Sequence, residues 1–304
     1  MNSTATTDGP VAPATVRLGD ATRVGGVELT VTDLERSIDF YTRIIGLQVH
    51  THGPGIARLG VGAEDLVTLH EDATATDPGR DAGIYHFALL FPSREELARV
   101  ARRIVEMRTP IDGASDHGVS EAIYLPDPDR IGVELAVDRP RAQWAEGAAA
   151  EFQRGGPAPL DVGDLMATIA GEQPSALAAP GLKGGHVHLH VGSLEDGLRF
   201  YRDGLGFEVQ MELPTAFFVS AGGYHHHLGF NVWRGRGAPA AADRAVGLRH
   251  WALIVESDEE LAGVRDRLTA LGFTVTQPKA GELLARDASN IAVRVATERV
   301  AAER

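Results

Sequence analysis

Apolar and polar residues alternate in two segments that repeat each other at an offset of 160 positions. In both segments, 27–31 and 187–191, every second residue is Val or Leu, and in the second these residues interleave with His186, His188 and His190. Alternation with a period of two places neighbouring side chains on opposite faces of a β-strand. The pattern predicts two equivalent strands, and it predicts a row of imidazoles on the polar face of the second, which is a suitable place for a metal ion.

A second pair of strand-like segments, 85–91 and 249–255, leads directly into two helix starts. Each is followed by Ser-x-Glu-Glu-Leu-Ala, a capping box in which Ser93 and Ser257 are the expected N-caps. Strand–helix starts therefore recur near positions 26, 86, 186 and 250, and short alternating strands follow each helix. The repeat predicts four modules of about 60 residues with the order β-α-β-β-β.

The four modules divide the chain into an N-terminal half at 21–138, with modules one and two, and a C-terminal half at 184–304, with modules three and four. Between the halves, residues 139–183 are rich in Ala, Gly and Pro, and we expect a surface linker with one short helix over 161–169. Residues 1–20 have neither a basic start nor a continuous hydrophobic stretch, so we expect a disordered tail rather than a secretory signal.

Composition narrows the functional classes. The net charge of -13 argues against nucleic acid or an anionic membrane as a partner, because both bind basic surfaces. No apolar run reaches the ~18 residues of a spanning helix. Because the chain has no cysteine, disulfides, iron–sulfur clusters and thiolate chemistry are excluded, and any metal must be held by His and carboxylate side chains. These properties predict a soluble, cytoplasmic protein.

The pattern H-V-x-L-x-V-x-D/S-L, followed by F-Y and then L-G-F, resembles the vicinal oxygen chelate superfamily. This superfamily includes glyoxalases, bleomycin-resistance proteins and extradiol ring-cleaving dioxygenases, and the resemblance is greatest to catechol 2,3-dioxygenases. It implies an α+β fold in which four βαβββ modules form two curved-sheet domains of paired modules, each sheet enclosing a cavity. It also implies two positions for metal ligands in each module, one at the start of the first strand and one in the middle of the last.

These positions carry different residues in different modules. At the first-strand position the four modules have, in order, Gly26, His86, His186 and His250. At the last-strand position module two has Glu134, which its apolar neighbours direct toward the cavity, whereas module four has Arg294, which cannot bind a cation. The resemblance therefore implies that His86, Glu134 and His186 form the 2-His-1-carboxylate triad of a non-haem Fe(II) site. His250 is expected to be structural or to lie next to the ligands.

This ligand set requires module two to pair with module three and module one with module four, which then form a supporting half. Some members pair adjacent modules instead, and that arrangement would offer His186 and His250 without an evident third ligand. A lone histidine at a strand end is more often a hydrogen-bonded core or surface residue than a ligand. The coincidence of three ligand-type residues at equivalent positions of the repeat favours the metal site.

Three further residues match catalytic positions of the extradiol dioxygenases. The run 222–227, Gly-Gly-Tyr-His-His-His, resembles the segment whose histidine acts as acid–base catalyst beside the iron, and the alignment places that role on His226. A slip of one residue would give His225 or His227 instead, and a solvent-exposed histidine cluster is the alternative.

Tyr124, ten residues before Glu134, matches a tyrosine that contacts the substrate oxygen, against the alternative of an ordinary strand aromatic. His117 lies in a segment similar to the family's Asp-His segment, with two extra residues before the tyrosine, and a plain loop histidine is the alternative.

The resemblance implies an Fe(II)-dependent extradiol dioxygenase that opens the ring of a catechol-type diol in aromatic catabolism, with O2 as co-substrate and no organic cofactor. Mn(II) and Zn(II) are the alternative metals. A glyoxalase-like isomerase or lyase is the first alternative function, although it usually has a second ligand carboxylate. A metal-free small-molecule binding protein is the second, and the intact triad argues against it. The expected partner is a small aromatic diol, and an exposed sheet edge would favour a homo-oligomer.

Overall fold

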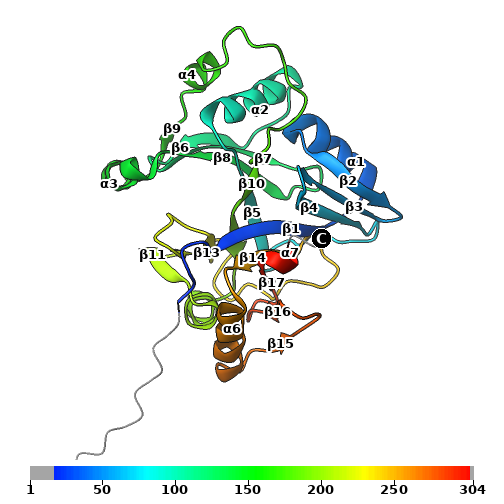
Figure 1. Ribbon diagram of the computed structural model, residues 1–304, viewed down its shortest axis with the longest axis vertical. Coiled ribbons are helices and arrows are strands. Elements are labelled where there is room, and N and C mark those ends of the chain that lie inside the picture. The colour runs from blue at the N-terminus through cyan, green and yellow to red at the C-terminus, as the bar shows by residue number, and fades with distance from the viewer. Residues whose placement is uncertain (1–16, 302–304) are drawn as a thin grey trace, which may run out of the picture.

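The structure, a computed structural model, describes residues 17–301 (Figure 1). Residues 1–16 of the expected tail lie outside the described residues. Of the remaining four, Leu18 is buried, and its backbone N–H donates a hydrogen bond of 3.3 Å to the carbonyl oxygen of Gly206. Among the described residues no helix is both long and apolar enough to cross a membrane.

The strands form two large sheets, and each sheet combines modules from both halves of the chain. The first has the order β15 (Val275–Thr276), β16 (Glu282–Arg286), β17 (Ala292–Thr297), β14 (Gly247–Val255), β1 (Arg23–Val31), β4 (Glu64–Glu71), β3 (Ile56–Val61), β2 (Gln48–Gly53). The second has the order β11 (Glu208–Leu213), β12 (Ala216–Ser220), β13 (Leu228–Asn231), β10 (Lys183–His190), β5 (Gly83–Leu90), β8 (Gly132–Asp138), β7 (Ser120–Pro126), β6 (Gly113–Asp116), β9 (Ala158–Pro159).

The pairing of module one with module four and of module two with module three is therefore confirmed, and the pairing of adjacent modules is wrong for this chain. The first strands of the paired modules meet as antiparallel neighbours at the centre of each sheet, β1 with β14 and β5 with β10. In every module the first strand also pairs in parallel with another strand of its own module. The predicted α+β fold with paired βαβββ modules is confirmed.

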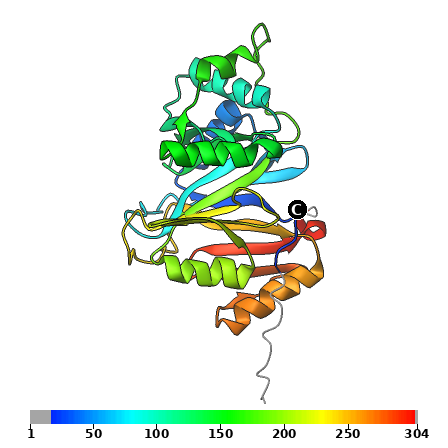
Figure 2. The ribbon, with the colours of Figure 1, turned by 90° about the vertical axis from the view of Figure 1, so that its left-hand side faces the viewer.

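The helices of each half pack against each other, whereas the central strand pairs join one half of the chain to the other. The helices α1 (Leu34–Phe40) and α5 (Leu194–Leu198) each continue into a π-helical turn, η1 (Tyr41–Ile45) and η3 (Arg199–Leu205). The longer helices α2 (Arg94–Glu106) and α6 (Asp258–Ala270) begin at the predicted N-caps, whose hydroxyls accept from the backbone N–H three residues on. The α2 helix packs against η1 and α6 against η3. In Figures 1 and 2, α2 and α6 lie at opposite ends of the molecule with the strands between them.

Side-chain contacts tie each helical turn to the neighbouring module of the same half. Arg103 of α2 donates to the carbonyl oxygens of Ile44 and Ile45 at 2.9 and 2.6 Å, and Arg267 of α6 makes the equivalent bonds to Gly204 and Leu205 at 3.0 and 2.6 Å. These bonds satisfy carbonyl groups that the end of a helix leaves without a partner. The repeat seen in the sequence therefore extends to individual hydrogen bonds.

The two sheets approach each other most closely where β1 passes β10. A Cβ atom on Gly184 would lie 2.3 Å from the carbonyl oxygen of Gly25, so only glycine fits at this position without moving the backbone. This contact joins the two sheets near the middle of the molecule. One continuous cluster of buried apolar residues extends through both.

The segment between the halves contains more structure than expected. It includes the short turn η2 (Arg141–Gln143), the helices α3 (Trp144–Arg154) and α4 (Val162–Ala167), and the strand β9. The α4 helix begins at Asp161, whose side chain accepts from the N–H of Asp164, as expected for the predicted short helix. The α3 helix was not predicted, and it lies next to the candidate site. A final short helix, α7 (Glu298–Ala301), follows β17.

Candidate metal centre

Three ligand-type side chains converge at the centre of the sheet formed by modules two and three. His86 comes from β5, Glu134 from β8 and His186 from β10, which are adjacent strands. All three side chains are buried. The Nε2 atoms of His86 and His186 are 3.2 Å apart, and Glu134 Oε2 is 3.1 Å from the first and 2.9 Å from the second. The structure therefore brings together the three residues that were predicted as ligands.

The spacing of these donor atoms suits a divalent metal. Donors on adjacent corners of an octahedron with bonds of about 2.1 Å lie ~3.0 Å apart, whereas donors on a tetrahedron lie ~3.4 Å apart. The observed separations of 2.9–3.2 Å match one face of an octahedron. A 2-His-1-carboxylate face leaves further positions open for other ligands. Among the described residues, this is the one group of at least three His, Asp or Glu side chains with such spacing.

The charge state of Glu134 also suits metal binding. Burial opposes the charged form, but the neighbouring imidazoles of His186 and His86 outweigh it and hold the pKa of this carboxyl group well below its usual range. The side chain is therefore a carboxylate at neutral pH. A buried carboxylate requires a positive partner, and a bound cation would supply one.

Tyr124 and His117 lie beside the carboxylate, as expected. Tyr124 on β7 is the cross-strand partner of Glu134 on β8, and its hydroxyl lies 2.9 Å from His117 Nε2. Burial, together with the negative charge of Glu134, raises the pKa of Tyr124 well above its ordinary value, so the phenol keeps its proton. The other nitrogen of His117, Nδ1, is 3.2 Å from Glu151 Oε1 of α3. Although burial opposes it, Glu151 and nearby carboxylates raise the pKa of His117.

His226 lies directly against His186, one of the three converging side chains. Its ring centroid is 4.2 Å from that of His186, and Phe218 of β12 packs against it edge-on at 5.2 Å. Burial, with smaller contributions from His186 and His225, lowers the pKa of His226 well below its ordinary value, so the ring is neutral at pH 7. The neighbouring His227 faces another way, because its Nδ1 accepts from the N–H of Ala221 at 3.2 Å. Of the three consecutive histidines 225–227, His226 is therefore the one that packs against the triad.

The other two histidines of β10, His188 and His190, are both hydrogen-bonded to the side chain of Asn231. Asn231 lies 2.9 Å from His188 Nε2 through its Nδ2 and 2.8 Å from His190 Nδ1 through its Oδ1. Burial lowers the pKa of His188 well below its ordinary value, and it lowers that of His190 to about 4. Both rings are therefore neutral neighbours of the triad, and their hydrogen bonds to Asn231 fix their orientation.

Two aromatic residues that were not predicted from the sequence, Tyr85 and Trp233, lie beside the triad and are called the aromatic wall below. In the ladder between β5 and β10, the partner of His188 is His86 but the partner of Leu189 is Ile84, so Tyr85 is the extra residue of a β-bulge. The bulge brings the Tyr85 ring to within 4.9 Å of the His86 ring, although adjacent strand residues normally face opposite ways. Trp233 meets Tyr85 edge-on at 5.4 Å, and the two rings are 49 % and 44 % exposed.

Among the residues that the structure describes, the corresponding face of the other sheet has no comparable ligand set. Strand register places Thr68 and Arg294 at the positions equivalent to Glu134, and Gly26 and His250 at those of the ligand histidines. His250 Nε2 is instead 3.4 Å from Glu28 Oε1, in a different sheet from the triad. His250 therefore lies in the other sheet, away from the three converging side chains, and not next to them.

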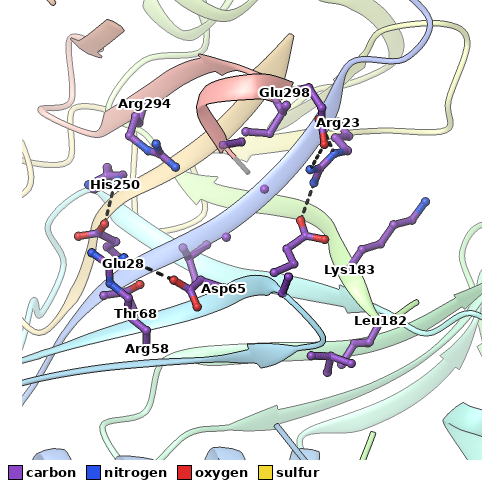
Figure 3. A pocket seen from close by; sticks show the side chains of 18 of the residues that line it. Arg23, Glu28, Arg58, Asp65, Thr68, Leu182, Lys183, His250, Arg294 and Glu298 are labelled. Carbon is purple, nitrogen blue, oxygen red and sulfur yellow. Dashed lines mark hydrogen bonds and ion pairs between the residues drawn. The ribbon is translucent and has the colours of Figure 1, made fainter. Parts of the chain in front are cut away.

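A cavity of about 460 Å³ lies over that face (Figure 3). Its charged side chains pair with one another. Arg23 contacts Glu64 at 2.6 Å and Glu298 at 3.0 Å, while Arg58 contacts Asp65 at 3.5 Å. The described residues that line this cavity include both cations and carboxylates, so its charges partly compensate each other, and among them no group of His, Asp or Glu side chains has the spacing of the triad.

Comparison with known proteins agrees with this architecture. The family model of the Glyoxalase/Bleomycin resistance protein/Dioxygenase superfamily matches residues 23–135 and 183–283. A protein named catechol-2,3-dioxygenase from Bacillus subtilis (strain 168) is 38% identical over 261 residues, which cover 84% of this chain and 90% of that protein.

Two solved structures share the fold at lower sequence identity. A putative dioxygenase from Bacillus subtilis subsp. subtilis str. 168 superposes with a TM-score of 0.63 at 15% identity, over 94% of this chain and 86% of the other. Glyoxalase I from Zea mays superposes with a TM-score of 0.56 at 18% identity, over 91% and 92% of the two chains. The matching family model and the 38% identical relative show that the chain belongs to the glyoxalase/bleomycin resistance protein/dioxygenase superfamily.

Proposed function

We propose that this protein is an Fe(II)-dependent extradiol dioxygenase that cleaves the ring of a catechol-type diol with O2. The observation that carries the proposal is the convergence of His86, Glu134 and His186, with donor separations of 2.9–3.2 Å, next to His226 and Tyr124. The relative from Bacillus subtilis, which is named a catechol-2,3-dioxygenase, supports the same reaction class.

The two histidines and the carboxylate would hold the metal. What Fe(II) supplies at such a triad is a set of adjacent open positions for both catechol oxygens and for O2. Glu134 provides the one negative charge of the ligand set, and its buried position on β8 fixes the distance to both imidazoles. The aromatic wall of Tyr85 and Trp233 offers an apolar surface on which a substrate ring can pack.

His226 is suited to move a proton. Because the ring is neutral at pH 7, it can take the proton of a catechol hydroxyl and later return it to oxygen, as a general base and then a general acid. Tyr124 keeps its phenolic proton and can donate a hydrogen bond to a substrate oxygen, and His117 orients that hydroxyl from its other side. In the overall reaction both atoms of O2 enter the ring-opened product.

The test is a turnover assay with protein loaded anaerobically with Fe(II). A panel of substituted catechols is mixed with oxygenated buffer, and the yellow ring-opened products and the consumption of O2 are recorded together. We expect at least one catechol to consume one O2 per ring opened. Absence of ring opening with the whole panel, combined with glutathione-dependent isomerisation by the Zn(II), Ni(II) or Mn(II) form, would instead favour a glyoxalase-like enzyme.

A further inference from the structure

A chain of hydrogen bonds leads from His226 to a carboxylate on the same strand as Glu134. His226 Nδ1 lies 3.0 Å from His225 Nδ1, and His225 Nε2 lies 2.9 Å from Asp138 Oδ1. We propose that His225 and Asp138 are positioning residues that fix the ring orientation and the tautomer of His226. This inference rests on the catalytic role proposed above for His226.

The tautomer follows from the chemistry of the three groups. A carboxylate accepts hydrogen bonds, so with a single proton on the His225 ring that proton lies on Nε2, facing Asp138. His225 Nδ1 is then bare and can only accept, which requires His226 to carry its proton on Nδ1. His226 Nε2 is left with a lone pair. The dyad therefore selects the form of His226 that can accept a proton from a substrate hydroxyl.

The dyad is held in place by its surroundings. The second oxygen of Asp138, Oδ2, accepts a hydrogen bond of 2.9 Å from the hydroxyl of Tyr224, whose ring packs on His225 with centroids 4.0 Å apart. Trp144, the first residue of α3, covers His225 from another side with ring centroids 5.1 Å apart. The side chain of His225 is consequently only 10 % exposed.

Strand geometry connects the dyad to the metal centre. Asp138 and Glu134 are four residues apart on β8, so they lie on the same face of the strand. One strand thus supplies both a metal ligand and the anchor of the acid–base histidine. The loop that carries Tyr224, His225 and His226 begins with Gly222 and Gly223, whose φ angles of 59° and 62° suit glycine and let three consecutive aromatic rings pack together.

Two substitutions of His225 separate positioning from packing. His225→Phe keeps a flat ring between Tyr224 and Trp144 but removes the acceptor for His226. His225→Asn loses the ring but retains a side-chain oxygen that can accept the Nδ1 proton. If the role is positioning, kcat falls about 10–100-fold in the Phe variant, while the Asn variant stays within several-fold of the parent. KM and bound iron should be unchanged in both. The opposite order, or full activity of the Phe variant, would overturn the proposal.

Two further variants test the other link of the chain. Asp138→Asn replaces an obligate acceptor by a group that can donate to His225 Nε2, which would reverse the chain and place the proton of His226 on Nε2. We expect a loss of kcat similar to that of His225→Phe. Tyr224→Phe removes the other hydrogen bond of Asp138 but keeps the bond between Asp138 and His225, so we expect a smaller loss of kcat than in Asp138→Asn. An equal loss in the two variants would contradict the role of the chain.

A spectroscopic measurement tests the tautomer of His226 independently of whether the protein catalyses the proposed reaction. Imidazole ¹⁵N chemical shifts of the metal-free protein at neutral pH report which nitrogen of His226 carries the proton. We expect Nδ1–H in the parent and in Tyr224→Phe, and a shift toward Nε2–H in Asp138→Asn. A parent protein that shows Nε2–H would refute the dyad whatever its activity. A parent that shows Nδ1–H but opens no catechol would refute the proposed reaction instead.

Discussion

His86 and His186 are 100 positions apart in the chain, yet their Nε2 atoms are 3.2 Å apart, and both lie within 3.1 Å of the same oxygen of Glu134. The central antiparallel pair of strands produces this contact, because β5 comes from the N-terminal half and β10 from the C-terminal half. The three side chains therefore converge only when the two halves are joined through this sheet.

Removal of the carboxylate should abolish tight metal binding. Glu134→Gln leaves two imidazoles and no carboxylate ligand, so we expect the affinity for Fe(II) or Mn(II) to fall at least ~100-fold, as measured by anaerobic calorimetry and metal analysis. Glu28→Gln is the matched control, because Glu28 contacts His70 and His250 in the other sheet. It should bind metal like the parent, and equal loss of metal in both variants would contradict the assignment.

His226 should matter for turnover rather than for metal binding. His226→Ala removes a ring that packs against His186 at a tilt but is not one of the three converging side chains. We expect bound iron to remain stoichiometric while kcat falls about 10²–10⁴-fold, the usual contribution of general acid–base catalysis. Rapid-mixing kinetics with a catechol substrate measure this loss. A variant as fast as the parent would remove His226 from the mechanism.

The ionisation of His117 should depend on the connecting helix. Glu151 of α3 contributes to the raised pKa of His117, so Glu151→Gln should lower that pKa. Histidine resonances followed through a pH titration of the metal-free protein measure the change. Glu146→Gln, on the same helix, is the control and should leave the titration of His117 unaltered.

The same contact has a consequence for stability. Because the folded-state pKa of His117 is raised, its contribution is fully present below the unfolded-state pKa and is lost as pH rises through the folded-state pKa. The difference in unfolding free energy between the parent and Glu151→Gln should therefore shrink as the pH is raised. A difference that grows with pH would contradict this account.

A buried aspartate should destabilise the fold as it ionises. Asp127 accepts from the N–H groups of Asp129 and Ile131 and from the Tyr41 hydroxyl, but burial raises its pKa from 3.8 to about 6. A raised pKa means that stability present below pH ~4 is lost as pH rises through about 6. Asp127→Asn should remove this loss, so its unfolding free energy relative to the parent should rise by up to ~3 kcal/mol between pH 4 and 7.

The C-terminal half contains an equivalent buried aspartate, Asp287, on which the same prediction can be tested. Asp287 accepts from Ser289, Ile291 and Tyr201 in the equivalent loop, and burial raises its pKa to about 6 as well. Chemical denaturation of Asp287→Asn at several pH values should therefore give the same trend. If neither variant changes the pH dependence, the two aspartates are ionised without cost in the folded protein.

Much of the architecture could be predicted because the sequence repeats itself. The capping boxes at Ser93 and Ser257 and the aligned first strands located the four modules, and unequal residues at equivalent positions indicated which modules must pair. Ligand geometry followed from this, since Glu134 and the ligand histidines occupy fixed positions on adjacent strands. The local sequence patterns and the internal repeat together were sufficient to predict the module boundaries, the module pairing and the positions of the three converging residues.

Features that break the repeat could not be predicted. Tyr85 lies against His86 only because a β-bulge interrupts the alternation, and nothing in the local pattern indicates that extra residue. Trp144 and Glu151 lie on a helix in the segment without a repeat, and their partners are distant in the chain. The bond between Asp138 and His225, 87 positions apart, depends on the loop conformation after two glycines with positive φ.

Each sheet contains strands from both halves of the chain, which suggests how such a chain could have evolved. With the same strand order, an ancestor of half this length would have had two modules whose first strands belong to different sheets, so it would have needed a second copy of itself to complete either sheet. That homodimer would have carried two identical centres. Gene duplication and fusion would then free one centre to diverge, and the arginine at position 294 together with the glycine at position 26 is what such a release leaves behind.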